Sequence, residues 1–210
     1  MKRKKRIYEP CFEVKGHIYM TPEGIIIPSV TEIIKAELNL YNFSSQAAAK
    51  RGEYVHQACQ WHDEGRLKVE SLDPVLIPFY NQYILFLKEN PSVKILQNET
   101  MRYSPKYLYA GRADKLALVN GVSALIDLKT CNILKQEIWH KWQTAAYEYL
   151  FRHECGEQER YILYLTPDEY LFVKHDNKRD FYEFLTLLAA HTIKINNGYR
   201  KQKEEFSEIE

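Results

Sequence analysis

Two aspartates and a lysine lie close together in the stretch YAGRADKLALVNGVSALIDLKT. Asp114 and Asp127 stand in apolar surroundings on either side of an Asn120-Gly121 pair, and Lys129 follows Asp127 by two residues. An Asn-Gly pair between apolar runs is a strong signal for a β-hairpin, because a type I′ turn needs positive φ at both central residues. With this pair as the loop, Asp114 and Asp127 are predicted to face each other across two strands.

Facing carboxylates of this kind need a neutralising partner. Cross-strand neighbours have Cβ atoms only ~4.5–5.5 Å apart, and like charges at such positions are destabilising. Side chains alternate along a strand, so Lys129 is predicted on the face of Asp127, with Leu116, Leu118 and Leu125 nearer the turn. The other face is predicted to carry Ala113, Ala117, Val119, Val122, Ala124, Ile126 and Leu128. A bound hard cation such as Mg²⁺ or Mn²⁺ is one interpretation, and a structural Asp–Lys ion pair at a sheet edge is the other.

The composition is typical of a globular protein and disfavours several other classes of protein. The chain has 210 residues, is 45% hydrophobic and has a net charge of +1, so its overall charge identifies no partner. The basic run KRKKR near the start indicates either a nucleic-acid contact or an ordinary solvated terminus. The four cysteines form no CxxC pair, which disfavours a zinc ribbon or a disulfide framework. The absence of a long apolar run, a signal peptide and a phosphate-binding loop predicts a cytoplasmic protein without membrane contact or nucleotide cofactor.

The pattern of elements predicts an α/β fold with a mixed central sheet flanked by helices. Helices are expected from near residue 30, over 44–62, around 81–89, over 138–153 and over 178–203. Strands are expected within 11–27, over 93–103, 109–119 and 122–130, and as a pair formed by RYILYLT and EYLFVKH. We expect one domain over 1–210, with N-terminal strands and helices at about 10–90, a core at about 91–175 and a C-terminal helix at about 178–203.

Other polar residues occur in a suggestive order around the hairpin. Gly52 and His56 share one helix face in RGEYVH, and Gln143 and Tyr147 do the same in WQTAAYEY. Glu99 lies within the strand sequence ILQNETMRY, just before the hairpin. Each also has a simpler interpretation, as a common helix histidine, the polar edge of a packed helix, or a solvent-facing strand residue.

Taken together, these segments resemble the PD-(D/E)XK nuclease superfamily, in particular its RecB-like exonuclease branch. The matching segments, which span about residues 28–150, are PSVTEII, RGEYVH, the strand with Glu99, AGRAD, IDLKT and WQTAAY. The first two are especially similar to those of phage exonucleases and of mitochondrial genome-maintenance exonucleases. The resemblance implies a restriction-endonuclease-like core.

The resemblance also implies a role for each residue. Asp114 and Asp127 would bind a divalent metal, with His56 and the Leu128 backbone carbonyl as further ligands. Lys129 would position and help activate the attacking water, so that Asp114, Asp127 and Lys129 form the catalytic set. Residues expected to hold DNA or brace the site are Gln143, Tyr147 and Arg112, with Glu99 as a weaker candidate.

The implied activity is a DNA exonuclease that depends on Mg²⁺ or Mn²⁺, acts on linear ends or single strands, and serves recombination, repair or genome processing in a phage or bacterium. A recombination protein or helicase is a conceivable partner, and the oligomeric state is left open. No cysteine follows Cys155, so no iron–sulfur cluster is expected. The alternatives are a structure-selective endonuclease and a catalytically silent module that binds nucleic acid or protein.

Overall fold

The structure of the chain is a computed structural model that describes residues 12–14, 18–40 and 46–200. The basic run near the start lies outside these residues. The elements are, in chain order, β1 (Phe12–Val14), β2 (Ile18–Met20), β3 (Ile26–Ile27), α1 (Val30–Glu37), α2 (Gln46–Asp63), the 3₁₀ helix η2 (Val69–Ser71), α3 (Ile77–Glu89), β4 (Val93–Ser104), β5 (Tyr109–Val119), β6 (Val122–Thr130), α4 (Trp139–Cys155), β7 (Glu159–Leu165), β8 (Tyr170–His175) and α5 (Arg179–Asn196). None of the described helices is long and apolar enough to cross a lipid bilayer.

A five-stranded mixed sheet forms the centre, with strand order β4-β5-β6-β7-β8. All neighbouring pairs are antiparallel except β6 and β7, which run parallel from Ala124↔Glu159 to Thr130↔Leu165. Parallel neighbours need a long crossover connection, and here α4 lies within that connection. The predicted fold class, a mixed sheet flanked by helices, is confirmed.

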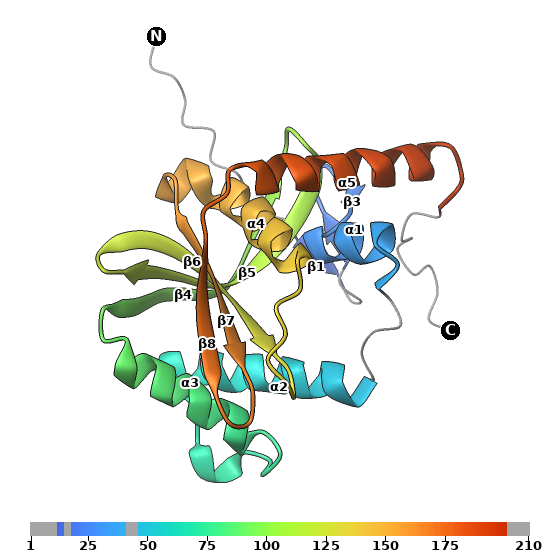
Figure 1. The fold of residues 1–210 in the computed structure, drawn as a ribbon. Coiled ribbons are helices and arrows are strands. Elements are labelled where there is room, and N and C mark those ends of the chain that lie inside the picture. The colour runs from blue at the N-terminus through green and yellow to red at the C-terminus, as the bar shows by residue number, and fades with distance from the viewer. Residues whose placement is uncertain (1–11, 15–17, 41–45, 201–210) are drawn as a thin grey trace.

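Helices cover both faces of this sheet, as Figure 1 shows. On one face α2 and α3 pack against the sheet through a core of Val55, Cys59, Phe79, Tyr83, Phe86, Ala117, Val119, Ala124, Ile126 and Leu128, among others. On the other face α1, α4 and α5 meet a second core that includes Val30, Ile33, Ile34, Tyr109, Ala113, Leu116, Leu125, Tyr147, Phe151 and Phe184. The central sheet therefore lies between two helical layers.

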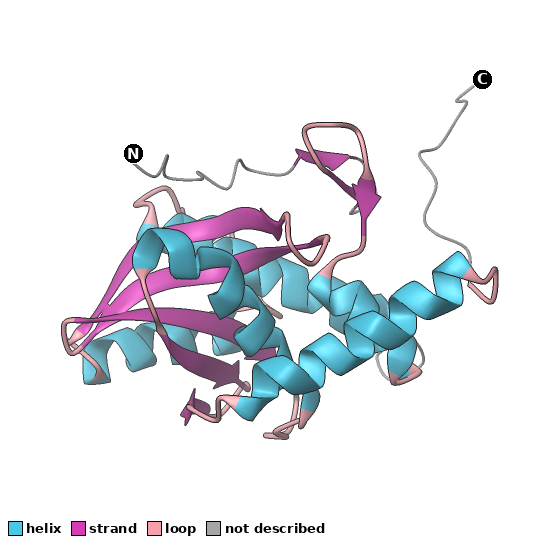
Figure 2. Cartoon of the chain, turned by 90° about the horizontal axis from the view of Figure 1, so that it is seen from above, coloured by secondary structure: helices cyan, strands magenta, loops and turns pink. Residues whose placement is uncertain are grey.

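A small antiparallel sheet, β1-β2-β3, lies at one corner of the molecule, beyond the ends of the long strands in Figure 2. Tyr19 and Ile27 pack there against Tyr103 and Ala110 of the central sheet. The chain then enters α1, where the Ser29 hydroxyl accepts a hydrogen bond of 3.0 Å from the Glu32 amide. A serine cap of this kind satisfies a free amide of the first turn, so the helix start predicted near residue 30 is confirmed.

The structure tests two boundaries predicted from the sequence, the hairpin turn and the end of the last helix. The hairpin turn is confirmed, because Asn120 and Gly121 have φ values of 51° and 80° and Val119 pairs with Val122. The last helix, predicted to reach residue 203, instead ends at Asn196. Gly198 follows with a left-handed φ of 72°, a conformation that commonly terminates helices.

Candidate metal centre

The site is built around the point where the hairpin stops pairing regularly. The register of β5 with β6 follows the prediction from Val119↔Val122 to Lys115↔Ile126, and Asp114 and Asp127 are the next residues on the two strands. At this point the Asp114 side chain replaces a backbone acceptor of the strand ladder, because the Leu128 amide donates a 2.7 Å hydrogen bond to Asp114 Oδ2. The two strands thus part at the aspartates, and β6 continues along β7.

The regular alternation of side chains between the two faces of the sheet is also interrupted at Asp114. Ala113 was predicted on the same face as Ala117, and this is wrong: Ala113 packs in the core of α1, α4 and α5, whereas Ala117 packs in the core of α2 and α3. On the neighbouring strand, Glu99 has a left-handed φ of 50° between the regular pairs of Asn98 and Thr100. A non-glycine residue in this conformation costs free energy and re-aims its side chain, which is a common feature of functional sites.

Three residues from three elements converge at this irregularity: His56 of α2, Glu99 of β4 and Asp114 of β5. One potential ligand atom from each lies within 4.8 Å of the other two. His56 Nδ1 is 3.5 Å from Asp114 Oδ2. The close approach of α2 depends on Gly52, because a Cβ there would lie 2.9 Å from Thr130 Oγ1 at the end of β6. Glu99, the weaker sequence candidate, therefore belongs to the group that is able to hold a metal.

The charges within this trio are strongly coupled. Burial raises the pKa of Glu99 and the Asp114 carboxylate raises it further, to about 7, although the Arg112 guanidinium 2.9 Å away opposes the rise. Burial would also raise the pKa of Asp114, but His56, Lys129 and the Leu128 amide lower it to about 2. The pKa of His56 is raised, because attraction to Asp114 exceeds the effect of burial. The same His56–Asp114 contact thus raises the pKa of the imidazole and lowers the pKa of the carboxylate.

Asp127 is the most enclosed carboxylate of the site, with a side chain only 1% exposed. Its Oδ2 lies 2.6 Å from Lys129 Nζ, and the ammonium of Lys129 is also 5.7 Å from the centre of the Trp139 ring. Burial, followed by repulsion from Asp114, raises the pKa of Asp127 to about 6 despite this lysine. Asp127 is not in the trio of convergent ligand atoms, so its role as a metal ligand, like that of the Leu128 carbonyl, stays a prediction.

Gln143 and Tyr147 of α4 are both buried. Gln143 Nε2 donates a 3.0 Å hydrogen bond to the Tyr147 hydroxyl, which is also 3.4 Å from Thr31 Oγ1. The Tyr147 ring fills the space left by Gly111, where a Cβ would lie 2.5 Å from Tyr147 Cε1. These contacts support the bracing role, and Arg112, bound to Glu99, is placed to do the same.

Several polar residues of this region were not singled out from the sequence. Lys115 is almost fully buried beside Asp114 and forms an ion pair with Asp63 of α2. The sequence did contain a signal for Lys115, because the alternation of side chains places this lysine on a strand face whose other residues are apolar. His140, near Lys129, is 2.9 Å from the Tyr164 hydroxyl, and burial followed by the Lys129 charge lowers its pKa to about 2. No local pattern distinguishes His140 from an ordinary helix histidine.

The donor set fits a divalent cation. Two carboxylates and one imidazole offer oxygen and nitrogen ligands, a mixture that suits Mn²⁺ better than Mg²⁺ because nitrogen is the softer donor. The raised pKa of Glu99 reflects its burial first and the nearby Asp114 carboxylate second. The structure therefore contains a cluster of His, Glu and Asp able to hold a metal ion.

Comparisons with known proteins support the fold. No protein-family model matches the chain, and no curated protein matches it. Among solved structures, a Eubacterium rectale protein named a "putative exonuclease" has a TM-score of 0.50 and 14% sequence identity, with 86% of this chain and 84% of that chain covered. The solved protein SSO0001 is 21% identical over 78% of this chain and 84% of that chain, but its TM-score of 0.40 is too low to indicate a shared fold. The first likeness indicates that the two chains share a fold.

Proposed function

We propose that the protein is a divalent-metal-dependent deoxyribonuclease that hydrolyses phosphodiester bonds of DNA from its ends. The observation that carries the proposal is the convergence of His56, Glu99 and Asp114 within 4.8 Å, next to the buried Asp127–Lys129 pair. The fold likeness to the Eubacterium rectale protein supports the same class of activity. Service in recombination or repair, with a partner protein, stays a prediction from the sequence.

The residues divide the work of hydrolysis between them. His56, Glu99 and Asp114 would hold the cation, with Asp127 and the Leu128 carbonyl as further predicted ligands. A bound divalent cation supplies Lewis acidity and lowers the pKa of a coordinated water. Asp127 keeps Lys129 Nζ inside the site, where an ammonium can donate to the attacking water and offset the charge that develops on the phosphoryl oxygens. Tyr147 would brace β5 through its close contact with Gly111, and Gln143 would hold Tyr147 in place through the hydrogen bond to its hydroxyl.

The test is cleavage of 5′-labelled and 3′-labelled linear DNA with Mn²⁺ or Mg²⁺. We expect cleavage to stop when EDTA removes the metal, to return when Mn²⁺ is added, and to fall by orders of magnitude in Asp114→Asn. Asp176→Asn is a matched control, because Asp176 is an exposed carboxylate just after β8. Cleavage that persists after verified metal removal, or an Asp114→Asn protein as active as the Asp176→Asn control, would refute the metal mechanism.

A further inference from the structure

We propose that Lys115 is a positioning residue that holds the three metal-binding side chains in register. The inference rests on the proposed function, since it concerns how the same site is assembled. Lys115 touches none of the reacting atoms in this role. It acts through the backbone and side chains to which it is bound.

The ammonium of Lys115 is the centre of a buried polar network. Lys115 Nζ forms an ion pair with Asp63 Oδ2 of α2 and donates a 2.9 Å hydrogen bond to Asn98 Oδ1 of β4. The Lys115 and Asp63 side chains are only 2% and 6% exposed. The second oxygen of Asp63 accepts a 2.6 Å hydrogen bond from the Tyr83 hydroxyl, and the ammonium is 4.8 Å from the centre of the Tyr83 ring. Buried charges need such partners, so the geometry of this network is strongly constrained.

Each partner in the network lies next to, or on the same helix face as, one member of the metal-binding trio. Lys115 follows Asp114 directly on β5, and Asn98 precedes Glu99 directly on β4. Asp63 follows His56 by two helical turns on α2, which places both residues toward the sheet. One ammonium therefore ties together the three elements that carry the three ligands.

The site needs such a tie because the backbone ladder is irregular there. Glu99 has a left-handed φ of 50°, and Asp114 is absent from the regular pairs of β5: it lies between two pairs with β4 and just beyond the last pair with β6. The Asn98↔Lys115 pair borders this irregularity directly. The side-chain hydrogen bond between Lys115 and Asn98 constrains the two strands where backbone hydrogen bonds of the ladder are missing. Sub-ångström placement of ligands depends on supporting contacts of this kind.

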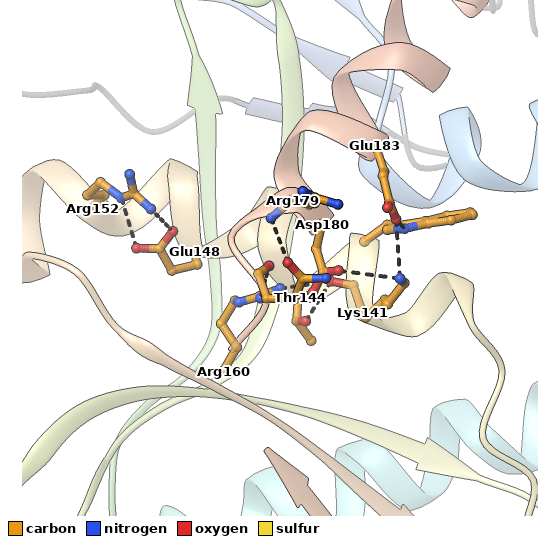
Figure 3. Close-up of polar contacts among 10 residues, drawn as sticks. Lys141, Thr144, Glu148, Arg152, Arg160, Arg179, Asp180 and Glu183 are labelled. Carbon is orange, nitrogen blue, oxygen red and sulfur yellow. Dashed lines mark hydrogen bonds and ion pairs between the residues drawn. The ribbon is translucent and has the colours of Figure 1, made fainter. Parts of the chain in front are cut away.

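A second buried ion pair provides the comparison that separates positioning from general stability. Arg160 of β7 donates a 2.9 Å hydrogen bond to Asp180 Oδ2 of α5, and these side chains are 8% and 1% exposed. Figure 3 shows Arg160, Asp180 and Lys141 converging on one another. Arg160 also donates to the Lys141 and Asn177 carbonyls. This pair matches Lys115–Asp63 in burial but joins β7 to α4 and α5, none of which carries a member of the trio.

The experiment compares Lys115→Met with Arg160→Met in the full chain. Both variants replace a buried cation by an unbranched apolar side chain. Mn²⁺ affinity is measured from the electron paramagnetic resonance signal of free Mn²⁺, and the melting temperature is measured on metal-free protein. We expect Lys115→Met to weaken Mn²⁺ binding about tenfold or more, as loss of a supporting contact to metal ligands typically does. Arg160→Met should lower the melting temperature but leave Mn²⁺ affinity at the wild-type value. The rate of DNA cleavage by Lys115→Met should recover largely at saturating Mn²⁺.

Asn98→Ala is the second variant, because it removes only one acceptor of the network and leaves the ion pair in place. A loss of Mn²⁺ affinity in Asn98→Ala supports the proposal even if Lys115→Met does not fold. Wild-type affinity in both Lys115→Met and Asn98→Ala, or in Asn98→Ala alone when Lys115→Met is unfolded, overturns it. Equal losses of affinity in Lys115→Met and Arg160→Met at matched melting temperatures also overturn it. A wild-type protein that binds no Mn²⁺ and cleaves no DNA would refute the proposed function itself, which is a separate result.

Discussion

At the scale of single residues, Asp114 and Asp127 differ in the groups that neutralise their charges. Asp114 accepts from the Leu128 amide and faces the His56 imidazole, whereas Asp127 forms its ion pair with the Lys129 ammonium. Burial acts against all of these charges, since a carboxylate in an apolar setting favours its protonated form. The opposite pKa shifts of Asp114 and Asp127 follow from this difference in partners.

Lys129→Ala should abolish most DNA cleavage while Mn²⁺ binding persists. The ammonium is predicted to act on water and on phosphoryl oxygens, and loss of one such donor costs on the order of 100-fold or more in rate. The measurement pairs single-turnover cleavage with Mn²⁺ titration. Lys135→Ala is the control, because Lys135 is an exposed lysine in the loop after β6. If Mn²⁺ affinity of Lys129→Ala collapsed together with the rate, the lysine would instead be needed to hold the site together.

Asp127→Asn should make the metal-free protein more stable at pH 8. The folded pKa of Asp127 is about 6, above its ordinary value of 3.8, so its contribution to stability is full below about pH 4 and is lost as the pH rises through 6. Asparagine does not ionise, which predicts a gain of roughly 1–3 kcal/mol in the free energy of unfolding at pH 8. The lone Lys129 left by the change favours the lower end of this range.

Urea denaturation of both proteins in EDTA, at pH 4 and pH 8, measures the difference. The gain should shrink toward zero at pH 4, where wild-type Asp127 is protonated. A metal-free Asp127→Asn protein that unfolds more easily than the wild type at pH 8 would show that the Asp127–Lys129 pair is mainly a structural ion pair.

At the scale of elements, the approach of α2 to the end of β6 decides whether His56 reaches the strands. Gly52 allows that approach, because a Cβ there would come within 2.9 Å of Thr130 Oγ1. His56 lies one turn further along the same helix face. A glycine that weakens the helix locally is thus positioned where close packing requires it.

A double-mutant cycle of Gly52→Ala and Thr130→Ala tests this contact. In the Thr130→Ala background the hydroxyl is gone, so Gly52→Ala should stabilise the protein by about 0.5–1 kcal/mol through helix propensity. In the wild-type background the same change should be neutral or destabilising, because the added methyl group meets the hydroxyl. Urea denaturation of all four proteins gives the coupling energy. Equal effects of Gly52→Ala in the two backgrounds would contradict the contact.

The elements also show what the sequence was able to predict. The hairpin, its register near the turn and the cap at Ser29 follow from residues close together in the chain, and all three are confirmed. The left-handed backbone of Glu99 and the change of face at Asp114 depend on how β4, β5 and α2 pack, which no local pattern contains. For the same reason neither Lys115 nor its partnership with Asp63 was predicted.

At the scale of the whole molecule, the site joins α2, from one helical layer, to strands β4 and β5 of the central sheet. We propose that the described residues form one domain, since α2 and α3 on one face and α1, α4 and α5 on the other all pack on the same five strands. A net charge of +1 gives little general attraction to DNA. Substrate choice is therefore expected to depend on local contacts at the site and on the form of the DNA.

Closed circular DNA should resist the protein while linear DNA of the same sequence is degraded. An enzyme that begins at a terminus has no starting point on a covalently closed circle. The measurement follows both forms in one reaction with Mn²⁺, with the same circle linearised by a single cut as the matched substrate. Rapid nicking of relaxed circles by pure protein would identify a structure-selective endonuclease instead.

The parallel pairing of β6 with β7 has a consequence for the order in which the centre is assembled during folding. β4, β5 and β6 are consecutive in the chain, and a β-hairpin forms in roughly 1–10 μs. β7 can join β6 only after the crossover through α4 has been made, and such non-local contacts form slowly. His56 arrives from α2, which is separated from β5 by α3 and β4. We therefore expect Glu99, Asp114 and Asp127 to be brought together before His56 joins them when the chain refolds.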